Sequence, residues 1–292
     1  MSIRNNEDRI GVKPDANPPV PIVNNNTENN DTTSETNFQF TTPTEFVDLP
    51  SRGEYYPEDH PLYKQDCVEI RYMTAKDEDI LSSKTLLKKG VAIERFLANI
   101  FVDKRIKPGN LLVGDKNAII IASRITGYGS EYKTRILCPV CGTHTEADFD
   151  LEEKKTKGAE SSDLYDITKT ENNTFVVQLP KSEVSVEVKL LYGTDERKLL
   201  TVSAQRKKKK LPEVNLTEQF RACMVAVNGH TKRNVIDSFI YSMPALDSRY
   251  LRDAMTEVTP NIELKQQFEC FSCDYEGEVE VPFTTDFFWP KR

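Results

Sequence analysis

Two short cysteine motifs decide how this chain folds: Cys138-Pro139-Val140-Cys141-Gly142 and Cys270-Phe271-Ser272-Cys273. Each is a C-x-x-C motif, and four thiolates in two such pairs can surround one Zn²⁺ ion tetrahedrally. The residues between the cysteines form a tight turn whose backbone N–H groups can point at the sulfur atoms. Gly142 suits such a turn because glycine adopts positive φ without strain, and Asp274 tolerates the left-handed conformation fairly well. We therefore predict a zinc site whose ligands are Cys138, Cys141, Cys270 and Cys273.

Both motifs lie between runs that are typical of strands. Residues 132–137 and 143–151 flank the first motif, and residues 266–269 and 278–283 flank the second. Alternation across a turn is typical of a hairpin, and two hairpins with a C-x-x-C at each tip make a zinc ribbon. Four thiolates leave no open coordination position for water, so this zinc would be structural rather than catalytic.

Other interpretations of the cysteines are free or redox-active thiols and disulfides. A redox-active C-x-x-C usually opens a helix after a strand, and neither pair does. The first residues contain no apolar signal core, so we expect a reducing cytoplasm, in which disulfides rarely persist. His144 is a competing ligand, but its C-x-x-C-x-x-H spacing gives poor geometry when a second cysteine pair exists. Cys67, on a strand, and Cys223, on an apolar helix face, need no ligand role.

Composition narrows the possible functions. The 292 residues carry a formal charge of −7, which disfavours broad binding to nucleic-acid phosphates. There are only three histidines, so a histidine-based metalloenzyme is not expected. No stretch approaches the roughly 18 apolar residues of a membrane span. No Gly-rich phosphate loop, H-E-x-x-H or G-x-S-x-G motif occurs. We expect no enzymatic activity, no membrane segment and no small-molecule substrate.

The expected fold class is α+β, with helical bundle elements and a four-cysteine zinc ribbon that is split by a mixed α/β insertion. Residues 1–37 contain no aromatic residue, and such a segment cannot bury enough apolar area to offset its ordering entropy. The expected divisions are a disordered tail (1–40), an arm and strand (41–73), a helical region (74–129), the first ribbon hairpin (130–151), a linker (152–173), an inserted α/β region (174–261), and the second hairpin with an aromatic C-terminus (262–292).

The helical region begins where Thr74 and Asp77 form a capping box, and one helix should run from there to Gly90. Two more helices are expected at about 91–102 and 110–126. Before them, residues 67–73 alternate as a strand. The arm Leu49–Pro57 is punctuated by proline and glycine into turns, and its two tyrosines either contact a partner or pack in the core.

The inserted region should contain an antiparallel strand pair, residues 175–180 and 184–190. Helices are expected at 195–210, from Thr217 through residue 227, at 235–241 and at 244–258, with a turn at Asn228-Gly229. The first of these helices ends in the basic run Arg206–Lys210, where cations meet the negative end of the helix dipole. We interpret the run as a solvated helix end, with a partner-binding patch and a nucleic-acid patch as the alternatives.

Several stretches resemble the T4-type bacteriophage baseplate hub assembly protein family, and the likeness covers residues 44–290. Besides the two C-x-x-C pairs, they are Leu49-Pro50-Ser51-Arg52-Gly53 with Tyr56-Pro57, Ile70-Arg71-Tyr72-Met73-Thr74-Ala75-Lys76-Asp77-Glu78-Asp79, Asp115-Lys116-Asn117, Arg124-Ile125-Thr126-Gly127-Tyr128-Gly129 and Phe287-Phe288-Trp289-Pro290.

The resemblance implies a protein needed to build the central hub of a contractile-tail baseplate, as an assembly chaperone or a minor component. It implies hub proteins as partners, and a location in the host cytoplasm during assembly and in the virion if the protein is a component. It implies no reaction and carries over no catalytic residues. We expect the helical face and the Leu49–Pro57 arm to bind hub proteins, and the terminal aromatic residues either to dock on a partner or to pack back on the ribbon.

Two competing classes remain. A zinc-ribbon nucleic-acid-binding or transcription regulatory protein would need a basic ribbon surface, and a thiol oxidoreductase would need thiols free of metal. The ribbon hairpins instead carry acidic residues that would repel phosphate: Glu146, Asp148, Asp150, Glu269, Asp274, Glu276, Glu278 and Glu280.

Overall fold

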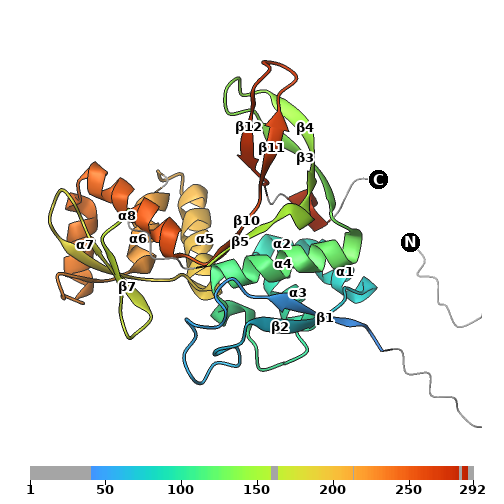
Figure 1. The fold of residues 1–292 in the computed structure, drawn as a ribbon, viewed down its shortest axis with the longest axis horizontal. Helices are drawn as coiled ribbons and strands as arrows, with labels where there is room; N and C mark the ends of the chain where they lie inside the picture. Colours follow the sequence, from blue (N-terminus) through green and yellow to red (C-terminus); the bar gives the residue numbers. More distant parts are fainter. Residues whose placement is uncertain (1–40, 159–163, 213, 283–284, 289–292) are drawn as a thin grey trace, which may run out of the picture. The chain divides into compact units, whose positions relative to one another are not determined.

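The computed structural model describes residues 41–158, 164–212, 214–282 and 285–288 (Figure 1). The segment 1–40, for which the sequence predicts disorder, lies outside the described residues, as do Trp289 and Pro290. The chain divides into two units, of which Thr42–Arg292 is the larger. This unit has mixed α+β secondary structure, as the sequence predicts.

Helix α4 (Val113–Tyr128) contacts elements from both ends of the chain. Two of its apolar side chains, Ile119 and Ile121, are fully buried. The helix was expected to begin at residue 110, but Pro108–Asn110 forms the 3-10 turn η2 and the next two residues are extended. Gly114 explains how closely α4 packs, because a Cβ atom there would lie 1.9 Å from the carbonyl oxygen of Pro260.

The N-terminal part pairs two strands and continues into helices. Val47 lies opposite Val68 in this antiparallel pair, and both side chains are buried. The prediction of a single helix from Thr74 to Gly90 is wrong. Ser83 has an extended backbone (ψ 106°) and divides the segment into two helices. Adjacent serines at this point compete with the backbone for hydrogen bonds and so favour a break. The elements are β1 (Thr44–Asp48), β2 (Cys67–Arg71), α1 (Ala75–Ser82), α2 (Lys84–Lys89) and α3 (Ala92–Ile100).

The inserted region is a four-stranded sheet in the order β6-β7-β8-β9, with helices α5 to α8. The expected strand pair is present, and two further strands extend it. Residues 224–227, expected to be helical, form β9, because this apolar run pairs with β8 and places Val227 opposite Val186. The turn at Asn228-Gly229 is present, with positive φ at both residues. The elements are β6 (Ile167–Lys169), β7 (Thr174–Gln178), β8 (Ser185–Lys189), α5 (Gly193–Lys208), α6 (Asn215–Cys223), β9 (Met224–Val227), α7 (Arg233–Ser242) and α8 (Ala245–Val258).

Buried Asp247 fastens this sheet to α8. Its two carboxylate oxygens accept hydrogen bonds of 2.8 Å from the backbone N–H groups of Lys181 and Ser182, in the turn between β7 and β8. A carboxylate that accepts backbone N–H bonds holds the turn and the helix in one arrangement.

The insertion leaves and returns through adjacent strands. The segment 152–173, expected to be a linker, contains β5 (Lys155–Lys157) and β6. Strand β5 follows the turn η3 (Leu151–Glu153) and pairs antiparallel with β10 (Asn261–Glu263), so that Thr156 lies opposite Ile262. The point where the chain enters the insertion and the point where it leaves it therefore lie next to each other.

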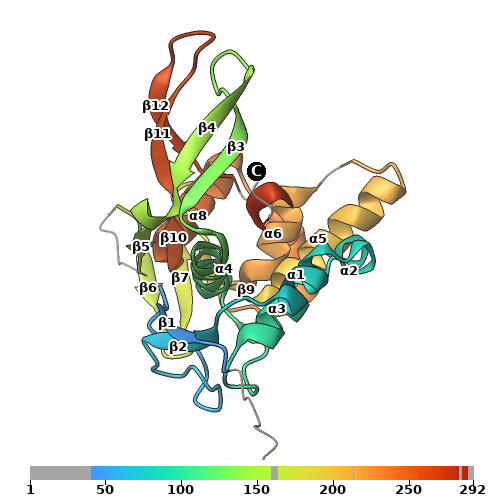
Figure 2. The ribbon, with the colours of Figure 1, turned by 90° about the vertical axis from the view of Figure 1, so that its right-hand side faces the viewer.

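Two hairpins carry the cysteine motifs, and we call them the cysteine hairpins. The first is β3 (Glu131–Leu137) with β4 (His144–Asp150), and the second is β11 (Lys265–Glu269) with β12 (Glu276–Glu280). They are separate two-stranded sheets that lie side by side in both views of the ribbon (Figure 1, Figure 2). Buried Gln266 joins the bases of the two hairpins. Its side-chain oxygen accepts a hydrogen bond from the backbone N–H of Asp150, and its side-chain NH₂ donates one to the Asp150 carbonyl.

Candidate metal centre

The two cysteine turns have the same backbone hydrogen bonds. In the first, the N–H of Gly142 donates to the carbonyl of Cys138, whose own N–H donates to Thr143. In the second, the N–H of Asp274 donates to the carbonyl of Cys270, whose own N–H donates to Tyr275. Gly142 (φ 69°) and Asp274 (φ 53°) occupy the same left-handed position, as the sequence predicts.

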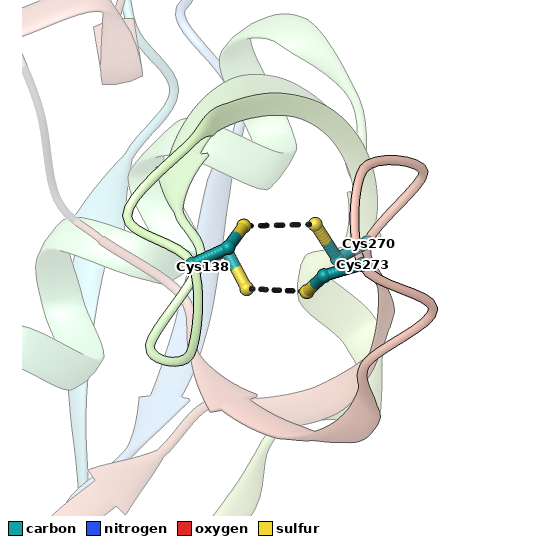
Figure 3. Close-up of side chains that lie close together, drawn as sticks. Cys138, Cys270 and Cys273 are labelled. Carbon is teal, nitrogen blue, oxygen red and sulfur yellow. Dashed lines mark hydrogen bonds between the residues drawn. The ribbon is translucent and has the colours of Figure 1, made fainter.

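These turns bring four sulfur atoms together from two distant parts of the chain. The Sγ atoms of Cys138, Cys141, Cys270 and Cys273 all lie within 4.8 Å of one another. The Sγ atom of Cys138 lies 3.7 Å from that of Cys273 (Figure 3). The Sγ atoms of Cys141 and Cys270 are also 3.7 Å apart. Each short distance joins one hairpin to the other, so the group holds the two tips together.

These distances fit a metal ion and do not fit disulfides. Sulfur atoms about 2.3 Å from a central zinc lie about 3.8 Å apart along the edges of a tetrahedron. A disulfide would need about 2.05 Å between sulfur atoms, and all four cysteines are free. The site is half enclosed, because Cys138 and Cys270 are buried while Cys141 is exposed. Metal binding by this group stays a prediction, and the geometry is compatible with it.

Local donors favour the thiolate form of Cys270 and Cys141. The backbone N–H of Ser272 lowers the pKa of the Cys270 thiol to about 6. The hydroxyl and the backbone N–H of Thr143 lower the pKa of Cys141. The backbone N–H of Tyr275 also lowers the pKa of Cys273, but burial and the three neighbouring thiols outweigh it and raise this pKa to about 12. The Thr145 hydroxyl, which is buried, lies 3.7 Å from the Cys270 sulfur and supports it from outside the cluster. His144, considered as a competing ligand, is exposed on β4 opposite Leu137 and does not belong to the group.

Away from the cysteines, a second group of motif residues meets at Asp115 on α4. Its carboxylate accepts hydrogen bonds from the backbone N–H of Ser51 (3.0 Å), the hydroxyl of Ser51 (2.6 Å) and the hydroxyl of Tyr56 (2.7 Å). The Tyr56 oxygen in turn accepts from the N–H of Leu112 at 3.0 Å. Burial raises the pKa of Asp115, and the hydrogen bonds from Ser51 and Tyr56 oppose that rise.

Asp115 therefore fixes the Leu49–Pro57 arm onto α4, with both arm tyrosines buried. Tyr56 also stacks on His60, with ring centroids 4.3 Å apart and planes 8° from parallel. Of the two alternatives for the arm tyrosines, packing in the core is the one observed, and binding of hub proteins by the arm stays a prediction. Arg52, Glu54 and Pro57 are the exposed residues of the arm.

A buried arginine near the C-terminal end of α4 fixes the end of the chain. Arg124 is fully buried and donates to three carbonyl oxygens, those of Phe287 (2.6 Å), Gly129 (2.5 Å) and Glu131 (2.9 Å). The rings of Phe287 and Phe288 are buried, and Phe288 packs edge-on against Phe96 of α3 at 5.4 Å. These two aromatic residues therefore pack back into the protein. Loss of hydration lowers the pKa of Arg124.

Asp77 is another fully buried charged residue. Arg71 donates to both of its oxygens (2.6 and 2.9 Å), and Asn99 and the N–H and hydroxyl of Thr74 complete the set. Burial alone would raise the pKa of Asp77, but the hydrogen bonds, led by Arg71, lower it to about 2. The capping box of Thr74 and Asp77, which the sequence predicts, is present. The sequence alone assigned no individual role to Asp115 or Arg124. A charged residue on an otherwise apolar helix is nevertheless a signal of a buried, hydrogen-bonded charge.

The chain matches the family described as T4 bacteriophage base plate protein over residues 41–289. The chain belongs to this family. No curated protein and no solved structure matches it. For this base plate protein, no helix among the described residues has both the length and the apolar character that a membrane span requires.

Proposed function

We propose that this base plate protein is a non-enzymatic assembly factor or minor component of the baseplate hub, and that it acts by binding hub proteins. The family match over residues 41–289 is the observation that carries the proposal. The buried roles of Asp77, Asp115 and Arg124 support it, because these three charged motif residues serve the fold.

A structural zinc ion is the second part of the proposal. Four sulfur ligands fill a tetrahedral zinc site and leave no position for a substrate or a water molecule. Zinc would then clamp the cysteine hairpins and present their outer faces at a fixed angle. We expect the protein to act in the host cytoplasm during phage assembly.

A nucleic-acid-binding zinc ribbon is the alternative, and charge argues against it. The outward positions of β4 and β12 include Glu146, Asp148, Glu276, Glu278 and Glu280, all exposed. Phosphate binding depends on Lys and Arg that release counterions. A retarded band on a DNA gel that weakens steeply with salt would favour the alternative.

The deciding experiment measures how many copies of this protein each virion contains. Quantitative mass spectrometry of purified virions should find a small, fixed number of chains per particle if the protein is a hub component. Its absence from particles, together with defective baseplates when its gene is deleted, would identify a transient assembly chaperone. Absence from particles with normal baseplates after deletion would overturn the hub assignment.

A further inference from the structure

The outer face of the second cysteine hairpin concentrates negative charge. The exposed residues of β11 and β12 form three cross-strand pairs: Lys265 with Glu280, Gln267 with Glu278, and Glu269 with Glu276. Like charges directly opposite each other on a sheet destabilise it. We call the face formed by Glu269, Glu276, Glu278 and Glu280 the acidic face.

The first cysteine hairpin offers an internal comparison. Its outer face also carries acids, but Lys133 pairs with Asp148 at 3.3 Å and Arg135 pairs with Glu146 at 2.9 Å. Among the ion pairs of the described residues, none includes a carboxylate of the acidic face. Within that part of the chain, the acids of the second hairpin therefore form no ion pair, although Lys265 lies opposite Glu280 on the sheet.

A second unpaired patch has the opposite sign. The lysines at the end of α5 and just beyond it are exposed, and no ion pair within the described parts of the chain involves them. Arg206, which precedes them, turns instead to the carbonyl of Pro212 at 2.9 Å. We call this patch, Lys207–Lys210, the lysine run.

Both patches have apolar side chains next to them. Phe271 is 80% exposed at the tip of the second hairpin, and Val140 is 67% exposed at the tip of the first. Leu211, directly after the lysine run, is 47% exposed. Lysine stems cover apolar surface well while their ammonium groups pair with carboxylates, so the two patches match in both charge and apolar content.

From this complementarity we infer that the chain associates with a second copy of itself, with the lysine run of one copy on the acidic face of the next. Such a contact joins two different patches, so it is heterologous and builds a closed ring or an open chain of copies. The inference rests on charge and exposure and not on the hub assignment, so either can fail alone.

The test is sedimentation velocity of the full-length protein at low and high salt. We expect association at about 50 mM salt that is largely lost at about 0.5 M salt, where screening shortens the reach of charge to a few ångströms. K207E/K208E/K209E and E276K/E278K/E280K should each weaken association about tenfold or more, because several weak exposed pairs are lost together. The matched control is K84E/K88E/K89E on α2, which reverses another exposed lysine cluster and should leave association unchanged.

The combined variant decides the matter. A chain that carries both triple reversals again has one basic and one acidic patch, with their places exchanged, and should regain association. An equal mixture of the two triple variants should also associate. A wild-type protein that stays monomeric at low salt, or a combined variant that does not regain association, would overturn the inference. Unchanged thermal unfolding of each variant shows that it is folded.

Discussion

Two regions of the molecule are held together differently. In the helical body, residues 44–128, buried charged side chains among apolar ones join segments that are far apart in sequence. The tips of the cysteine hairpins are joined by the four cysteine side chains. Asp77, Asp115 and Arg124 are each fully buried and hydrogen-bonded to named partners. The hairpins bury a few apolar residues, such as Tyr132 and Phe268, and join at their tips through four cysteines. The body should therefore respond to pH, and the hairpins to metal chelation.

The largest effect is expected at the sulfur cluster. Cys138→Ser removes one ligand, and metal binding contributes about 10–16 kcal/mol to folding in finger peptides. The zinc content, measured by elemental analysis, should be about one ion per chain in the wild type and lower in this variant. Hydrogen exchange should show protection lost in both cysteine hairpins and kept in α4.

Cys67→Ser is the matched control, because Cys67 lies on β2, outside the cluster. It should keep the metal content and the exchange pattern. Equal zinc content in Cys138→Ser and Cys67→Ser would contradict the assignment of the ligands.

Removal of the Asp115 carboxylate should be the next largest effect. Asp115→Ala leaves the buried donors of Ser51 and Tyr56 without an acceptor. Each unsatisfied buried group costs about 1–3 kcal/mol, so we expect a loss of about 3 kcal/mol in urea unfolding. Asp79→Ala, at an exposed position of α1, should change stability little. Equal losses in the two variants would mean that Asp115 does not anchor the arm.

A smaller, pH-dependent effect is expected at Asp77. Its folded pKa of about 2 lies below the ordinary 3.8. The stabilisation, about 2 kcal/mol, is therefore complete above about pH 5 and is lost as the pH falls towards the folded pKa. Asp77→Asn should be less stable than wild type at neutral pH, and the gap should narrow in acid as wild type loses its advantage. A gap that stays constant down to the folded pKa would argue against the low value.

The smallest effect is expected at the left-handed turn position that the two hairpins share. Gly142→Ala meets no neighbouring atom, so only its positive φ opposes it, at about 1 kcal/mol. Gly142→Asp should cost less, because Asp274 already occupies the same conformation in the other turn. Thermal unfolding of the two variants measures the difference, and an Asp variant less stable than the Ala variant would contradict it.

The cysteine turns could be predicted because their geometry is local. Cys138 and Gly142 are close in sequence, and the turn they form depends on few other residues. Asp115 and Arg124 could not be given roles, because Ser51, which binds Asp115, and Phe287, which binds Arg124, lie 64 and 163 residues away. Residues 224–227 form a strand because β8 supplies hydrogen-bond partners, which a helical pattern of apolar residues does not reveal.

The pairing of β5 with β10 changes how the metal site would assemble. These strands join the chain just after the first cysteine hairpin to the chain just before the second, so Lys157 lies opposite Asn261. Neighbouring strands lie about 4.8 Å apart, so this pairing holds the two ends of the long insertion together without help from the sulfur atoms. The two thiolate pairs then behave as the arms of one chelating agent, at an effective concentration of about millimolar for a short tether. The chelate effect would make capture of the ion a property of the single chain, independent of protein concentration.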